Sequence, residues 1–146
     1  MGKFFGFFKN ICSFMVGDPL SPYIFILYQD ALSRNIHQSL VEGRMLSFIN
    51  RYGSNCISHL MFADDVLVFI SGRCISITSF MDIMSMYSKV SRQKINPRKG
   101  KVFISRKYHR KHSVAIQDIM EIQRKQIPMA YLGAPISNGR MKKGPF

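Results

Sequence analysis

The sequence contains no apolar run near the length that a bilayer span requires. A transmembrane helix needs about 20 consecutive apolar residues, whereas the longest apolar stretches, such as 23–28 and 66–70, have the length of a strand or a short helix. Residues 4–8 follow Lys3 as in a signal peptide, but Lys9 interrupts them and no small-residue cleavage site follows. We therefore expect neither a membrane segment nor secretion.

Cysteine is scarce. The chain has an odd number of cysteines, three, and they are widely spaced: Cys12, Cys56 and Cys74. None forms a Cys-x-x-Cys pair, so we expect no disulfide partner, no zinc site and an intracellular setting. His109 and His112 flank Arg110 and Lys111, whose charges would repel a metal cation, so this stretch is interpreted as basic surface. No dedicated targeting signal is present, and only the basic cluster points toward the nucleus.

Acidic residues are few and unevenly placed. The chain has 8 Asp and Glu against 21 Lys and Arg, a formal net charge of +13. Residues 1–91 are nearly neutral, whereas residues 92–146 carry fourteen of the basic residues and two of the acidic ones. A concentrated positive field favours a polyanion such as nucleic acid. The alternative is a solvated basic face without a ligand.

What is present is enough for one packed domain. The chain has 146 residues, 47% of them hydrophobic and 12% aromatic, which favours a globular core over disorder. Ser21 as N-cap and Pro22 as first helical residue predict a helix that Gly43 closes. A second helix is predicted around 77–90 and a third over 113–122, with strands in the first fifteen residues and at 45–49, 102–105 and 129–132. The pattern predicts an α+β fold for 1–146.

The most informative stretch is two strand-like segments, 57–63 and 66–70, separated only by Asp64 and Asp65. This pattern predicts a tight antiparallel hairpin. Adjacent carboxylates repel each other unless a cation meets them, and Mg²⁺ or Mn²⁺ prefers carboxylate oxygen. Such a tip suits two-metal phosphoryl transfer. The alternative is a plain solvated turn, which Asp tolerates well.

Five short blocks follow one another in a fixed order over nearly the whole chain. Besides the tip, Phe62-Ala63-Asp64-Asp65, they are Gly6-Phe7-Phe8, Gly17-Asp18-Pro19-Leu20-Ser21-Pro22, Ser91 to Lys99, and Tyr131-Leu132-Gly133-Ala134-Pro135-Ile136. The tip resembles the aromatic-x-Asp-Asp signature of the reverse transcriptase of plant LINE-type (non-LTR) retrotransposons, and the other blocks resemble that family's neighbouring segments. The resemblance implies a partial polymerase palm, with an antiparallel β-hairpin sheet packed against two or three helices, truncated at both ends.

The resemblance also implies an RNA-directed DNA polymerase, a nucleotidyltransferase with an RNA template, a DNA primer and a deoxynucleotide as partners. Asp64 is expected to bind both magnesium ions and Asp65 to assist it. Gly17 would let the backbone approach template or nucleotide, Gly133 would pack against the primer, and Lys99 would neutralise or protonate pyrophosphate or act as a phosphate clamp. Backbone phosphates would be contacted by Arg92, Lys94, Arg98, Lys101, Arg106 and Lys107.

Two departures from the family pattern lower the polymerase activity that we expect of this chain. The family's preceding block carries another metal-binding aspartate, and this chain starts after it. Asp18 lies in a turn and is no substitute. The residues Met15-Val16 and Cys12-Ser13 replace polar pairs expected near the nucleotide. We therefore expect poor Mg²⁺ binding and no polymerisation by this chain alone. The alternatives are a non-catalytic basic nucleic-acid-binding remnant and an inert remnant of a decayed insertion.

Overall fold

A computed structural model describes residues 3–11, 19–48, 57–96, 99–104, 110–122, 124–125 and 129–136. Within these ranges the helices are α1 (Ser21–Val41), α2 (Cys74–Ser91) and α3 (Arg110–Met120). The strands are β1 (Lys3–Ile11), β2 (His59–Phe62), β3 (Asp65–Ser71), β4 (Lys94–Ile95), β5 (Lys101–Ile104), β6 (Arg124–Lys125), β7 (Met129–Tyr131) and β8 (Ala134–Ile136).

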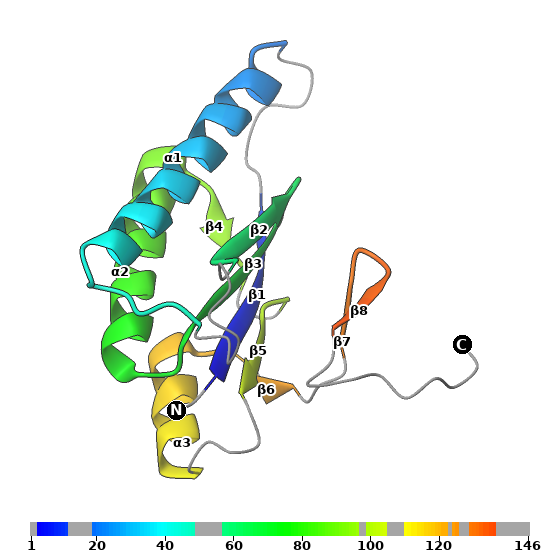
Figure 1. Ribbon diagram of the computed structural model, residues 1–146. Coiled ribbons are helices and arrows are strands. Elements are labelled where there is room, and N and C mark those ends of the chain that lie inside the picture. Colours follow the sequence, from blue (N-terminus) through cyan, green and yellow to red (C-terminus); the bar gives the residue numbers. More distant parts are fainter. Residues whose placement is uncertain are drawn as a thin grey trace.

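The described strands form one large sheet and one separate hairpin. The large sheet has the order β2-β3-β1-β5-β6, with β4 also pairing with β1. Its pairs are antiparallel except β5 with β6. Figure 1 shows α1, α2 and α3 on one side of this sheet and the β7–β8 hairpin on the other. The predicted α+β fold, a hairpin sheet packed against helices, is therefore confirmed.

The core lies between the sheet and the helices because alternate residues of a strand point to the same face. Val66, Val68 and Ile70 of β3 are each 0% exposed and supply one wall. The opposite wall comes from α1, α2 and α3, through residues such as Ile36 and Phe80. None of the helices in the described part of the chain has the length and hydropathy that a membrane span requires.

Helix α1 begins at Ser21, one residue earlier in the sequence than the predicted start at Pro22. Leu20 occupies the N-cap position, and no side chain caps the helix there. Ser21 is therefore not the N-cap, and Pro22 still lies in the first turn, where its missing N–H costs nothing. The helix ends at Val41, and Gly43 follows with a φ of +73°, a conformation that favours glycine.

The predicted strand at 45–49 is wrong over its described part, residues 45–48. Only an isolated bridge joins Ser47 to Ile70. Two backbone N–H groups that a strand would use for pairing have other acceptors. The Met45 N–H donates to the Ser39 carbonyl at 3.0 Å, and the Leu46 N–H donates to Ser76 Oγ at 3.0 Å. Met45 of this segment is nevertheless buried and belongs to the hydrophobic core.

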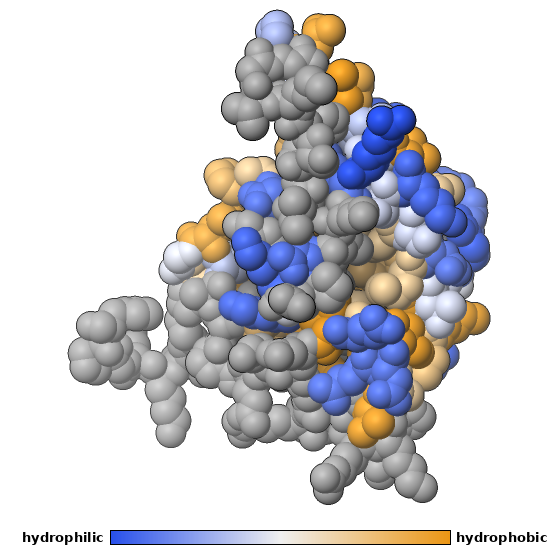
Figure 2. Space-filling view, turned by 180° about the vertical axis from the view of Figure 1, so that it is seen from behind, coloured by the Kyte–Doolittle hydropathy of each residue, from blue (hydrophilic) through white to orange (hydrophobic). Residues whose placement is uncertain are grey.

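The first turns of α1 extend past the sheet and expose large apolar side chains. Tyr23, Ile26 and Leu27 are each more than 60% exposed. Apolar atoms lie at the top of Figure 2, over this end of α1. A surface of this kind is typical of a face that another segment or partner covers.

Candidate functional site

The twin aspartates lie at a hairpin tip, as the sequence predicts, but the turn is shifted by one residue. Ala63 and Asp64 form the turn, and Asp65 is already the first residue of β3, paired with Phe62 of β2. A two-residue loop requires positive φ at its first or at both positions, and Ala63 has a φ of +48°. That backbone is unusual for a residue other than glycine.

Asp65 belongs to the face of the sheet that points away from the helices. It lies one residue before Val66, which faces the helix core, so the two side chains leave β3 on opposite faces. Asp64 and Asp65 are both half-buried, and one carboxylate oxygen of Asp65, Oδ1, is buried. On β1 the residue directly opposite Asp65 is Lys9.

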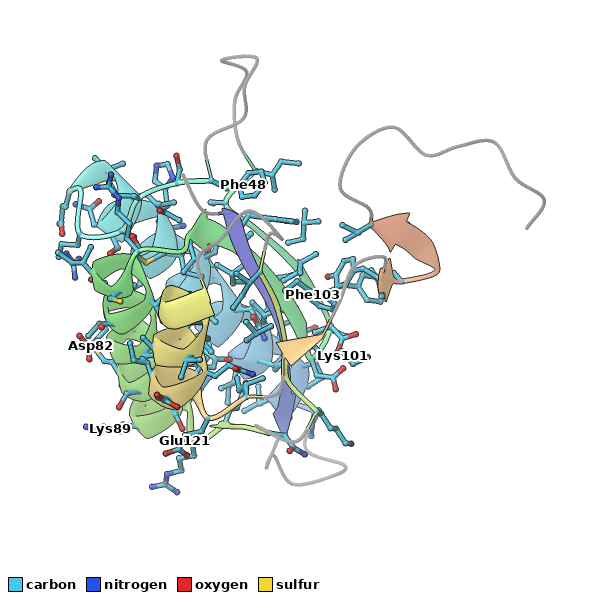
Figure 3. The ribbon with its side chains drawn as sticks, turned by 90° about the horizontal axis from the view of Figure 1, so that it is seen from below. Phe48, Asp82, Lys89, Lys101, Phe103 and Glu121 are labelled. Atoms are coloured by element: carbon cyan, nitrogen blue, oxygen red, sulfur yellow. The ribbon has the colours of Figure 1, made fainter. Side chains whose placement is uncertain are left out.

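Basic residues of the next segment gather at the same end of the sheet as the tip. Lys101 of β5 pairs with Phe7, and Lys94 of β4 pairs with Ile11, while Asp65 pairs with Lys9 between them. Lys101 is exposed, and Figure 3 shows it with Phe103 on the side of the sheet away from the helices. Basic and acidic residues from separate parts of the chain therefore occupy nearby register positions at one end of one sheet.

Lys99 lies in the turn that joins β4 to β5. The Asn96 carbonyl accepts hydrogen bonds from the N–H groups of Lys99 and Gly100, at 3.1 and 3.0 Å. The Lys99 side chain is exposed. Because the turn precedes Lys101, it lies toward the hairpin end of the sheet, where a phosphate group could meet the lysine.

A buried polar network fixes the chain where α2 ends and Arg92 begins this basic segment. The Tyr87 hydroxyl donates to Gln93 Oε1 at 2.5 Å, and Ser91 Oγ donates to the Tyr87 carbonyl at 2.7 Å. The Gln93 N–H then donates to Ser91 Oγ at 3.2 Å. Arg92 is left exposed in a left-handed conformation, with a φ of +56°. The network determines the direction in which the chain leaves α2 toward β4.

Tyr131 of β7 lies near the acid pair, although sequence reasoning gave it no role. Burial raises the pKa of its phenol, and the negative charge of Asp65 raises that pKa further. The phenol therefore stays protonated near neutral pH. No local signal could have revealed this proximity, because the two residues are distant in the sequence.

Gly133 has a structural role in the hairpin that carries Tyr131. Leu132 and Gly133 connect β7 to β8 with φ values of +50° and +80°, the pattern of a type I′ turn. A methyl group at Gly133 would meet no atom within 4 Å among the described residues. Its backbone conformation therefore accounts for the glycine here, and the primer contact stays a prediction.

His59 joins α1 to the hairpin and was also missed. Its Nε2 lies 2.7 Å from Ser33 Oγ on α1, and its Nδ1 lies 2.8 Å from Ser58 Oγ. Burial lowers the pKa of this imidazole, and the nearby His37 lowers it further. A signal was present in the sequence, because position 59 shares a face with Met61, which packs on the core. A polar residue at a core-facing position needs a partner.

The acid pair by itself does not fit a two-metal site. Mg²⁺ requires a near-octahedral set of oxygen ligands, and the described residues contain no group of three His, Cys, Asp or Glu that could hold an ion. The described side chain near the pair is the phenol of Tyr131, which remains protonated and adds no negative charge. The metal roles of Asp64 and Asp65 therefore stay predictions. The predicted contacts of Gly17, Arg98, Arg106 and Lys107 lie outside the described residues.

A twin-aspartate hairpin in an antiparallel sheet with helices on its other face is the arrangement of a polymerase palm. Comparison with protein families shows to which class of polymerases this palm belongs. The family model described as reverse transcriptase (RNA-dependent DNA polymerase) matches residues 6–136. The chain belongs to this family, whose members use RNA and DNA strands, deoxynucleotides and divalent metal ions.

The chain is also similar to a plant protein. Over 49 residues it is 45% identical to an uncharacterized mitochondrial protein of Arabidopsis thaliana. The matched stretch covers 34% of this chain and 40% of that relative. This chain therefore spans less than half of the relative it matches.

Proposed function

We propose that the chain is one palm unit of a non-LTR retrotransposon reverse transcriptase, and that the sheet face away from the helices receives nucleic acid. The observation that carries the proposal is the placement of Asp65 and Lys101 on that one face, at one end of the sheet. In an intact polymerase, Asp64 and Asp65 would face the nucleotide's phosphates through divalent ions. Lys99 would meet the departing phosphates, and Gly17 and Gly133 would lie beside template and primer.

The basic residues have the character of phosphate contacts, which position a strand without reading its sequence. Lys99 and Lys101 are exposed at the hairpin end, and Arg92 is exposed at the end of α2. The predicted set also includes Lys94, Arg98, Arg106 and Lys107. On α2 the exposed Asp82 offsets the exposed Lys89, so this helix adds no net charge of its own.

We expect no polymerisation by this chain alone, because no third His, Cys, Asp or Glu joins the two carboxylates among the described residues. Two carboxylates alone do not hold two ions in line with the attacking and leaving oxygens. The measurement is primer extension on poly(rA)/oligo(dT) with Mg²⁺ or Mn²⁺, and the expected product is indistinguishable from that of the Asp64→Asn variant. DNA synthesis that Asp64→Asn abolishes would show that the acid pair is complete, and would overturn this expectation.

Nucleic-acid binding is expected to be salt-dependent and indifferent to sequence. Each lost phosphate contact reduces the slope of log K against log salt by about 1. The double variant Lys99→Gln/Lys101→Gln should therefore reduce the slope by about 2 and weaken binding about tenfold near physiological salt. Fluorescence anisotropy with a labelled RNA–DNA duplex at several salt concentrations measures both quantities.

The matched control is Arg73→Gln/Lys89→Gln, which removes the same charge from exposed positions on α2 and its N-cap. Lys89 lies in the helix layer in Figure 3, so this variant should change the slope by less than half as much. Equal losses in the two double variants would mean that only net charge matters and no face is preferred. Binding that survives Asp64→Asn while extension is absent favours the non-catalytic nucleic-acid-binding alternative.

A further inference from the structure

Helix α1 and the strand that leads to the acid tip are joined by a histidine. His59 is the first residue of β2, and its Nε2 lies 2.7 Å from Ser33 Oγ on α1. The other ring nitrogen, Nδ1, lies 2.8 Å from Ser58 Oγ, in the residue before the strand. Both nitrogens of the imidazole are therefore engaged, one in linking two elements and one in orienting the ring.

These two contacts suit a neutral ring better than a charged one. A neutral imidazole has one N–H donor and one acceptor nitrogen, and a serine hydroxyl can match either of them. A protonated imidazole donates from both nitrogens and carries a full positive charge, which a carboxylate stabilises far better than a hydroxyl does. Ser33 and Ser58 thus hold the ring without supplying a counter-charge.

The charged groups that α1 carries near this ring do not stabilise its protonated form. His37 lies one turn after Ser33, is exposed, and adds a second positive charge in acid. Asp30 lies one turn before Ser33 and is bonded to Arg34 at 2.7 Å, so these two charges offset each other. In acid, the net contribution of this helix to the ring is therefore repulsive.

The neighbouring strand supplies no counter-charge to the ring either. The residue opposite His59 on β3 is Val68, and the one acid of β3, Asp65, belongs to the opposite face of the sheet. Burial lowers the pKa of His59, and the nearby His37 lowers it further. The closed arrangement of this joint therefore disfavours a proton on the ring.

Strand β2 is well placed to open without disturbing the core. It has four residues, lies at one edge of the described sheet, and pairs there with β3 alone. Its residues alternate between half-buried and exposed, whereas Val66 and Val68 of β3 are fully buried. Elements with few buried contacts open locally at a low free energy. A change at His59 can therefore act on β2 while the helices stay packed on the sheet.

We propose that Ser33, His59 and Ser58 form a pH-sensitive latch between α1 and β2, closed while the imidazole is neutral and opened by its protonation. Because β2 runs directly into the turn formed by Ala63 and Asp64, the latch determines how firmly the acid tip is attached to the helix layer. The latch goes beyond the proposed function, since it requires neither nucleic acid nor a metal ion.

The pH effect has a defined direction. The pKa of His59 is lower in the closed latch than the ordinary value of about 6.5, which the ring regains when the latch opens. The open form therefore binds more protons than the closed form, and the opening constant rises as the pH falls below about 6.5. One proton changes this constant by at most about tenfold per pH unit. Well above pH 6.5, the latch keeps its full stability.

The test is hydrogen exchange of the full chain followed by mass spectrometry between about pH 7.5 and pH 5, corrected for the pH dependence of intrinsic exchange. Protection of β2 (59–62) should fall as the pH decreases, by up to about tenfold per unit. Protection of α2 (74–91), which lies in the packed core, should change less than about twofold. In His59→Gln, whose amide can still bond both serines but does not titrate, the protection of β2 should stay constant within about twofold.

His37→Gln is the second variant, and it leaves the latch residues in place. It removes the smaller of the two causes of the lowered pKa of His59, so the pH effect on β2 should shrink without disappearing. This comparison keeps the proposal testable even if circular dichroism shows that His59→Gln does not fold.

Three results would each overturn the latch. The first is a protection of β2 that does not change with pH in the unmodified chain. The second is the same pH dependence in His59→Gln. The third is a loss of protection in α2 as large as that in β2, because acid would then unfold the whole chain and not a single joint.

Discussion

Replacing Phe80 by alanine is expected to destabilise the chain by about 3–5 kcal/mol, the range for a buried phenylalanine whose cavity cannot collapse fully. Phe80 is 0% exposed on the inner face of α2 and belongs to the cluster that packs the helices against β3. Domains of this size have a total stability of about 5–15 kcal/mol. The free energy of unfolding in urea, followed by circular dichroism, measures the loss.

Val90→Ala on the same helix is the control. Val90 is 63% exposed, so its truncation should change the unfolding free energy by less than about 0.5 kcal/mol. If both variants unfold at the same urea concentration, α2 is not packed on the sheet. The acid tip would then lack its support, because α2 and β3 share the core from which the hairpin extends.

Local elements could be predicted from the sequence because their signals are local. Pro22 and Gly43 bound α1, and the apolar spacing before Ser91 marks α2, although the structure extends that helix back to Cys74. The hairpin was predicted with a turn one residue too late. Two acidic residues between apolar runs resemble a two-residue loop, but the closing pair is Phe62 with Asp65.

The pairing of distant strands could not be predicted in this way. Residues 4–8 are almost uniformly apolar, so their pattern indicates a strand without saying which face is buried or which neighbours it has. The structure places β1 in the middle of the sheet, between β3 and β5. The position of Lys9 beside Asp65 follows from that pairing alone, and so does the meeting of the basic segment with the acid tip.

Polar partners of buried residues were missed for a related reason. Ser33 and His59 are 26 residues apart in the sequence, yet their side chains bond at 2.7 Å. The pKa of Tyr131 is raised by burial and also by the charge of Asp65, which is even more distant in the sequence. Resemblance to the family identified the blocks that carry Asp65 and Tyr131 but not Ser33 or His59, and only the fold brings each pair of side chains together.

Tyr87→Phe is expected to cost about 1–3 kcal/mol, although it removes a single oxygen. Gln93 is 1% exposed, and its Oε1 accepts the Tyr87 hydroxyl at 2.5 Å. Without that donor the amide oxygen is buried with a lost hydrogen bond, which costs more than the bond itself contributes. The measurement is again the urea unfolding free energy.

The decisive comparison is the double variant Tyr87→Phe/Gln93→Met, which replaces both polar partners by apolar side chains. Removal of both partners can be nearly neutral, so the double variant should recover most of the stability lost in Tyr87→Phe. No recovery would mean that the network stabilises through Ser91 alone. The single variant should also weaken duplex binding, because the network directs Arg92 and the following lysines toward the hairpin end of the sheet. A destabilised variant that still binds with the full salt slope would separate this network from the nucleic-acid surface.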